Sequence, residues 1–313
     1  MADMSAYFKT FSTHPTCRIV IDSCSDATLP MVRAMGVDLI EFPFVMADGD
    51  HLDDQYQSMT PAEFYGRMRS GERVLTSAIP TGRFVEVFEW CAEQGVPTLY
   101  LSFTAGLSSS VLDAQQAASM VLAAHPEFDL LVMDNCLPAL TASLLAIGAC
   151  YQRDEGMTMR QVAAWCSENK SRVHGYFTLD SLDWLVAGGR VPKAAASLSS
   201  VLDMKANLTY DLDGALTLTG VSRGRKKAIK NLVKELAEGF EEGVSRVVGI
   251  VDADCPADAA TLERLVREEL GERCPQIYHM PLNPTIGAHV GPGMLALAFW
   301  GSDRAANAKR GKR

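Results

Sequence analysis

Apolar segments of strand length alternate with segments of helical periodicity through the first half of this chain, and this alternation limits the possible folds more than any other feature. The expected strands cover residues 18–22, 37–45, 97–102 and 128–134. The expected helices cover residues 83–94, 109–124 and 138–153. Parallel strands need crossover connections, which are usually helices. The first half is therefore predicted to form an open parallel sheet flanked by helices, in the α/β class.

The second half shows a different pattern, which predicts a mixed sheet. Residues 206–221 alternate around Asp213-Gly214, which indicates an antiparallel hairpin. Further strands are expected at 175–179, 246–251 and 276–280, and further helices at 158–173, 225–241 and 256–271. A chain of 313 residues, 48% of them hydrophobic, exceeds the usual size of one core. We therefore expect two α/β domains, residues 1–155 and residues 156–313.

Composition and charge narrow the range of functions. The net charge is −9 and the pI is about 5.2. A surface of that charge repels nucleic acid and anionic membranes unless a local basic patch overrides it. The eight cysteines show neither CxxC nor zinc-finger spacing, so we expect free thiols in a reducing cytoplasm and no metal site. A signal peptide and an apolar window of about 18 residues are not found, which predicts a cytoplasmic protein without a transmembrane helix.

Sharp enzymatic signatures are missing from the sequence. It lacks a Gly-x-x-x-x-Gly-Lys-Ser/Thr loop, a His-Glu-x-x-His motif and a Gly-x-Gly-x-x-Gly motif. The segment Gly106-Leu107-Ser108-Ser109-Ser110 begins like the nucleophile turn of serine hydrolases but has no closing glycine. These absences weaken the ATPase, metalloprotease, dehydrogenase and esterase interpretations.

Three hydroxyl-rich turns follow expected strands in the first half. They cover residues 22–26, 76–77 and 104–110. Ligands of open parallel sheets bind at the carboxyl ends of the strands, so the three turns are expected to meet at one edge. Hydroxyl groups and helix N-terminal amides suit a carboxylate or a phosphate. The alternative is that these residues are ordinary helix N-caps, where Ser, Thr and Asp are common.

Three further segments are candidates for binding. Residues 286–293 surround His289 with three glycines and a proline, which predicts a fixed, close-packed loop. His289 could bind an anion, contact a partner or be structural. The segment 188–193 and the cluster Arg223–Lys230 carry cations that suit an acidic or phosphate-bearing partner. The alternative for the cluster is a helix start whose charged side chains are simply exposed to water.

Six of these motifs, taken in order, closely resemble the DegV family, which includes the fatty-acid-binding subunits of bacterial fatty acid kinase. The resemblance covers roughly residues 17–301. The segments that carry it are Ile21-Asp22-Ser23-Cys24-Ser25-Asp26, Thr76-Ser77, Gly106-Leu107-Ser108, Gly188-Gly189-Arg190-Val191, Arg223-Gly224-Arg225-Lys226-Lys227-Ala228 and Gly287-Ala288-His289-Val290-Gly291-Pro292-Gly293.

The resemblance implies two α/β domains with one long-chain fatty acid buried between them, the first domain supplying the carboxylate-binding turns and the second covering the acyl chain. The carboxylate would be held by Thr76 or Ser77 and by Ser108, with His289 nearby. Arg190 matches the family arginine that is associated with engaging the kinase. Arg223 and Arg225 are further candidates for docking to that partner. Such a protein needs no cofactor and performs no catalysis. An ATP-dependent fatty acid kinase phosphorylates the carboxylate, and the binding protein carries the acyl phosphate onward, with transient membrane contact and no role for nucleic acid.

The chain departs from the family pattern near the expected head-group site. The family often has Thr-Ser-Gln-Pro-Ser where this chain has Thr76-Ser77-Ala78-Ile79-Pro80. Ser109 replaces the glycine that usually follows the pocket serine, and Pro192 stands where a serine is common. The hydroxyls at positions 77 and 108 are retained.

Two other classes of function compete with this interpretation. One is a serine-type acyl hydrolase that uses Ser108 and His289. The other is a regulatory or DNA-binding protein that uses Arg223–Lys230 and binds duplex DNA in a salt-sensitive way. The sequence leaves open the length and saturation of the lipid, the identity of the kinase, the oligomeric state and the apolar residues of the pocket.

Overall fold

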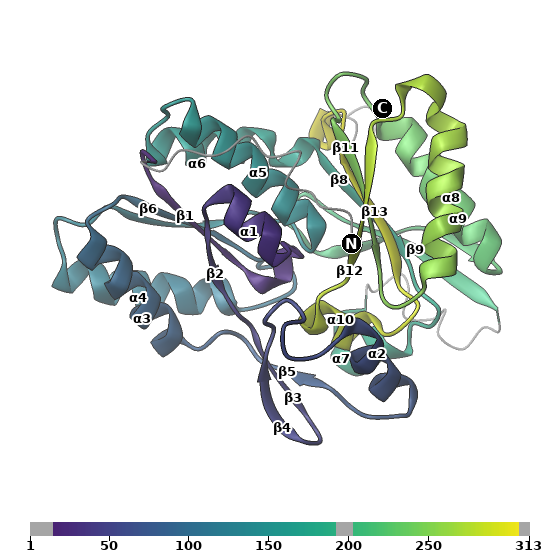
Figure 1. Cartoon of the computed structure of the whole chain (residues 1–313), viewed down its shortest axis with the longest axis horizontal. Coiled ribbons are helices and arrows are strands. Elements are labelled where there is room, and N and C mark those ends of the chain that lie inside the picture. The colour runs from purple at the N-terminus through teal and green to yellow at the C-terminus, as the bar shows by residue number, and fades with distance from the viewer. Residues whose placement is uncertain (1–14, 192–202, 307–313) are drawn as a thin grey trace.

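The computed structural model describes residues 15–191 and 203–306. Two α/β domains lie side by side, and their strands and helices follow the order shown in Figure 1. The first contains a parallel sheet flanked by helices and the second a mixed sheet, so the predicted fold class is confirmed. No helix in the described part of the chain is long and apolar enough to cross a membrane.

The N-terminal sheet has four parallel strands in the order β2-β1-β6-β7. The strands are β1 (Arg18–Asp22), β2 (Asp38–Ile40), β6 (Thr98–Ser102) and β7 (Leu130–Asp134). Alternate residues of a strand face opposite sides of the sheet, and here both sides are apolar. Val20 and Tyr100 pack on one side, and Ile19, Ile21 and Leu99 pack on the other.

Helices cover both faces of this sheet. On the Tyr100 side lie α3 (Thr81–Gln94) and α4 (Ser110–Ala124). On the other side lie α1 (Leu29–Met35), α5 (Leu140–Asp154) and α6 (Met159–Asn169), which is followed by the 3-10 helix Lys170–Arg172. Figure 1 shows α5 between the two domains. The apolar core on this side continues into the second domain, and the boundary near residue 155 stays a prediction.

The strand expected at residues 37–45 is broken, which corrects the sequence interpretation. Its first part is β2, and its second part, β3 (Pro43–Met46), joins a separate antiparallel sheet with β4 (Gly49–Leu52) and β5 (Leu75–Thr76). The break lies at Phe42, whose amide donates to the Ser23 hydroxyl at 3.0 Å while its carbonyl accepts from Asp53 at 2.8 Å. Proline at position 43 has no amide with which to extend the parallel ladder.

The C-terminal sheet has six strands in the order β10-β9-β8-β13-β11-β12. The strands are β8 (Val173–Thr178), β9 (Met204–Tyr210), β10 (Leu216–Arg223), β11 (Val247–Asp252), β12 (Gln276–Pro281) and β13 (Leu295–Trp300). The pair β11 and β12 is parallel, and the other pairs are antiparallel. The predicted hairpin over 206–221 is confirmed.

One face of this sheet is covered by α8 (Arg225–Gly239) and α9 (Pro256–Leu270), which is followed by the 3-10 helix Gly271–Arg273. The other face meets α5 of the first domain. There Gly249 on β11 is needed, because an added Cβ would lie 2.0 Å from Leu140 Cδ2. The absence of a side chain at Gly249 thus lets the two domains approach closely.

Three short helices lie below the two sheets, near the small antiparallel sheet in Figure 1. They are α2 (Pro61–Arg69), α7 (Asp183–Gly188) and α10 (Pro284–Val290). The prediction of a close-packed loop over 286–293 is wrong for the first half of that segment, because α10 extends to Val290. The Asn283 side chain accepts from the Ile286 amide at 2.8 Å and Pro284 follows, which together form a strong helix start.

Candidate functional site

A cavity of about 170 Å³ lies between the two domains. Its walls come from the loops at the carboxyl ends of β5, β6 and β7, from β8 and β13, and from α10. Most of the lining is apolar and includes Phe42, Phe103, Phe177, Tyr210, Leu216 and Met294. The site therefore suits a ligand with a long apolar portion.

Five of the residues selected from the sequence lie on the wall of this one cavity. They are Thr76, Ser77, Ser108, Arg190 and His289. They come from the end of β5, the loop before α4, the residues after α7 and the last turn of α10. The hydroxyl-rich turns at 76–77 and 104–110 thus meet at one cavity, although β5 belongs to the small antiparallel sheet and not to the parallel sheet as expected. Their role in carboxylate binding stays a prediction.

Thr76 and His289 form a direct hydrogen bond, with 2.6 Å between Thr76 Oγ1 and His289 Nε2. Burial, together with the nearby positive charge of Arg190, lowers the pKa of His289 to about 4. The imidazole is therefore neutral at pH 7. Its Nδ1 is buried without a hydrogen-bond partner among the described residues, and an added Cβ on Gly188 would lie 2.4 Å from it.

The Ser108 side chain belongs to a small network at the start of α4. Ser108 Oγ lies 3.2 Å from Ser110 Oγ and also accepts from the Ser110 amide at 3.2 Å. Ser110 Oγ in turn accepts from the Ile79 amide at 3.0 Å, which ties this loop to the one that follows Thr76 and Ser77. The N-terminal end of a helix of 15 residues lies beside these hydroxyls, and its dipole favours negative charge there.

Arg190 lies at the exposed rim of the cavity. Its Nε donates to the Leu107 carbonyl at 3.4 Å, and a second guanidinium nitrogen donates to the Gly188 carbonyl. Arg190 thus connects the loop before Ser108 to the end of α7, where Gly189 adopts the left-handed conformation that ends the helix. Pro192, at which the sequence departs from the family, lies outside the described residues.

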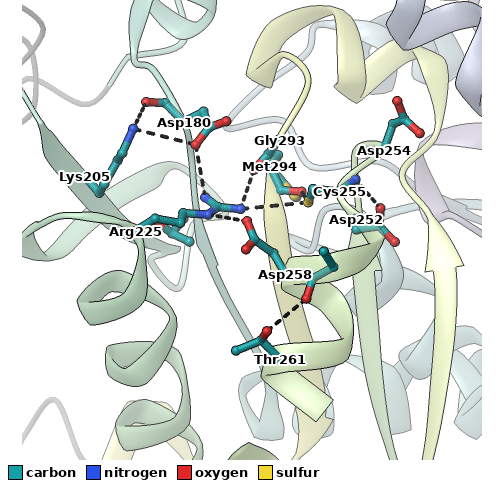
Figure 2. Close-up of polar contacts among 12 residues, drawn as sticks. Asp180, Lys205, Arg225, Asp252, Asp254, Cys255, Asp258, Thr261, Gly293 and Met294 are labelled. Atoms are coloured by element: carbon teal, nitrogen blue, oxygen red, sulfur yellow. Dashed lines mark hydrogen bonds and ion pairs between the residues drawn. The ribbon is translucent and has the colours of Figure 1, made fainter. Parts of the chain in front are cut away.

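The basic segment near residue 225 does not reach the cavity. Arg225 donates to Asp258 at 2.8 Å and to the Gly293 carbonyl at 2.6 Å, and Figure 2 shows its guanidinium between Asp180 and Asp258. These contacts hold α8, α9 and the loop before β13 together. Arg223 is exposed at the end of β10. The docking role stays a prediction for both residues, although Arg225 Nε and Nη2 already donate within the chain.

The sequence did not reveal the role of three buried aspartates beneath the cavity. Asp22 accepts from the Phe103 amide at 2.7 Å, Asp26 from the Asn283 amide at 3.0 Å, and Asp53 from the Thr285 hydroxyl at 2.7 Å. Burial raises the pKa of each carboxyl to about 7. Asp22 and Asp26 of the turn at 22–26 thus fix the loop after β6 and the start of α10, while Cys24 of the same turn lines the cavity. The ligand-binding role of this turn stays a prediction.

The geometry does not support the hydrolase interpretation. Nucleophilic catalysis by serine needs a hydrogen bond from the serine to the base, and a third group to orient the base. Ser108 Oγ is bonded to Ser110, and His289 Nε2 is bonded to Thr76. An acidic partner of His289 Nδ1 is also missing among the described residues.

These features define the class of the protein. An apolar cavity between two α/β domains, with hydroxyls, a neutral imidazole and a helix N-terminus at one end, suits an amphipathic ligand. A family model described as "Uncharacterised protein, DegV family COG1307" matches residues 16–301. The chain belongs to the DegV family.

Relatives of known sequence or structure match nearly the whole chain. A DegV domain-containing protein of Clostridium perfringens is 31% identical over 286 residues, which are 91% of this chain and 98% of the relative. The structure of a DegV lipid binding protein from Thermotoga maritima has a TM-score of 0.77 at 26% identity and covers 92% of this chain and 99% of its own. A second Thermotoga maritima structure, described as revealing fatty acid binding function, has a TM-score of 0.77 at 25% identity. It covers 92% of this chain and 100% of its own.

Proposed function

We propose that the protein binds one long-chain fatty acid in the cavity, with the acyl chain along the apolar walls and the carboxylate at Thr76, Ser77 and Ser108. The observation that carries this proposal is the meeting of two hydroxyl-bearing loops at one end of an apolar cavity. The lipid and fatty acid binding described for the two Thermotoga maritima relatives supports the same ligand class.

The energetics favour such a ligand. Each methylene removed from water contributes about 0.8 kcal/mol, which is reduced by the cost of ordering the chain. Removing the carboxylate from water costs several kcal/mol unless hydrogen bonds replace its hydration. The hydroxyls of Thr76, Ser77 and Ser108 and the amides at the start of α4 offset that cost by hydrogen bonding, and the neutral His289 supplies no charge.

The protein performs no catalysis of its own in this proposal. An ATP-dependent fatty acid kinase in the cytoplasm phosphorylates the bound carboxylate, and the protein carries the acyl phosphate. Arg190 is exposed at the cavity rim and is the best placed of the basic candidates to contact that kinase. Brief contact with a membrane would allow the lipid to be exchanged.

The ligand can be identified directly. The protein is purified from a bacterial host and denatured, and its organic extract is analysed by mass spectrometry beside the Ser108→Ala and Ser119→Ala variants. Ser119 is an exposed residue of α4 and serves as the control. One fatty acid per chain, reduced in Ser108→Ala alone, is the expected result. An empty extract, with no uptake of added fatty acids, would overturn the proposal.

A further inference from the structure

Cys136 and Lys170 form a close contact that the proposed function does not use. Lys170 Nζ lies 3.0 Å from Cys136 Sγ. Five of the eight cysteines are buried, and Cys136, Cys255 and Cys274 are partly exposed. Among these three, Cys136 is the one that contacts a lysine of the described chain, since Cys255 contacts Arg225 and Cys274 contacts the Pro275 carbonyl.

Both groups are held in place by their surroundings. The Cys136 amide donates to Asp134 Oδ1 at 2.8 Å, and Cys136 adopts a φ of 55° in the loop between β7 and α5. Its carbonyl lies against the hairpin turn of the second domain, where an added Cβ on Gly214 would come within 2.9 Å of it. Lys170 begins the 3-10 helix that leads into β8. The sulfur and the amine therefore face each other from two separate segments, the loop after β7 and the 3-10 helix after α6.

We propose that Cys136 and Lys170 are an oxidation site at which the sulfur and the amine become joined through one oxygen atom. The thiol and the neutral amine react with dioxygen to give Cys–S–O–NH–Lys and water. The thiol loses one hydrogen and the amine loses one. One oxygen atom enters the bridge and the other leaves as water. Sulfur and nitrogen each give up two electrons, which together reduce the dioxygen.

The contact geometry favours this product over further oxidation of the sulfur. An isolated cysteine that is oxidised proceeds along the ladder to sulfinic and sulfonic acids. A bond from a nearby amine nitrogen to the first oxygen added to the sulfur ends that progression and keeps the oxygen in the bridge. Lys170 already occupies that position. The bridge would tie the loop before α5 to the start of β8, and the residues that follow each of them, Pro138–Thr141 and Gly175–Phe177, line the cavity.

The test is peptide mass spectrometry on the full chain after exposure to air or dilute peroxide. The expected product is a pair of linked peptides containing Cys136 and Lys170, heavier by one oxygen and lighter by two hydrogens than their sum, and separated again by dithiothreitol. The link is expected to disappear in Cys136→Ser and in Lys170→Arg, which keeps the charge. It is expected to persist in Cys274→Ser.

Because the readout is a covalent link, it does not depend on lipid binding. The proposal is overturned if the natural chain gives no linked peptides and Cys136 is recovered as a free thiol or as sulfinic acid in the same proportion as Cys274. It is also overturned if Lys170→Arg leaves the linked product unchanged. Circular dichroism of each variant identifies any that fails to fold, and the two substitutions at different positions give independent answers.

Discussion

Replacing Thr76 by valine removes the hydroxyl of this residue and keeps the shape of its side chain. Valine keeps the β-branched side chain that suits the short strand β5, so the local backbone is expected to persist. What is lost is the hydroxyl that lies 2.6 Å from His289 Nε2 and, in the proposed function, donates to the fatty acid carboxylate. Thr76→Ser restores that hydroxyl and is the matched variant.

The expected loss of affinity follows from the charge of the ligand. A hydrogen bond to a charged group contributes about 1.5–3 kcal/mol, and each 1.4 kcal/mol is a factor of ten in affinity, so Thr76→Val is expected to weaken binding roughly 10- to 100-fold. His289 Nε2 also loses its partner, which adds to the cost when the ring is buried. Thr76→Ser is expected to stay close to the natural protein.

The assay is a titration of delipidated protein with a fluorescent fatty acid, accompanied by a thermal unfolding curve for each variant. Thr261→Val on α9 controls for the general effect of the substitution, because Thr261 donates only to the Ala257 carbonyl of its own helix. If folded Thr76→Val binds the fatty acid as tightly as the natural protein does, Thr76 is not a carboxylate donor and the proposed position of the head group is refuted.

Three further predictions test other parts of the structure. Gly188→Ala is expected to weaken fatty acid binding in the same titration, because the new methyl would push His289 away from Thr76, whereas Gly220→Ala, where nothing lies within 4 Å, is expected to bind normally. Arg190→Ala is expected to reduce phosphorylation by a fatty acid kinase, followed with labelled ATP, more than it reduces fatty acid loading; equal losses would contradict a docking role. The buried carboxyl of Asp53 has its folded pKa raised to about 7, so the fold binds protons more tightly than the unfolded chain, and stability is expected to fall as the pH rises from about 4 to about 7. Asp53→Asn is expected to reduce the slope of the melting temperature against pH across that range, with Asp22 and Asp26 supplying the remainder, whereas Asp50→Asn at an exposed position of β4 leaves the slope unchanged. An unchanged slope in Asp53→Asn would contradict the assigned titration.

Local periodicity was sufficient to predict the central strands and helices of the first domain. The strands β1, β6 and β7 and the helices α3 and α4 lie within a few residues of their expected ranges, since alternation and helical spacing are properties of consecutive residues. The break at Phe42 was missed although Pro43 is a local signal for it. The other part of its cause is remote. It depends on Ser23 and Asp53, which reach Phe42 from other segments of the chain.

The site was predictable in part for a similar reason. The rule that ligands bind at the carboxyl ends of parallel strands correctly selected the turn at 104–110, which follows β6. The turn at 76–77 also lines the cavity, but it follows β5 of the antiparallel sheet, so the rule is not the reason for its position. The helix α10 was missed although its signal was present, because the glycines of 287–293 were given more weight than Asn283-Pro284. The Thr76–His289 bond joins residues 213 positions apart, and no pattern in the sequence indicates a contact of that range.

The buried aspartates explain how a helix of only seven residues can position His289. Asp53 accepts from both the amide and the hydroxyl of Thr285, and Asp26 accepts from both the amide and the side chain of Asn283, so two carboxyls hold the first turn of α10. An apolar side chain at either position would leave these buried amides unpaired, which is costly. The polar residues at the end of β1 therefore contribute to the site indirectly. They fix the helix that carries His289, while the hydroxyls above them face the cavity.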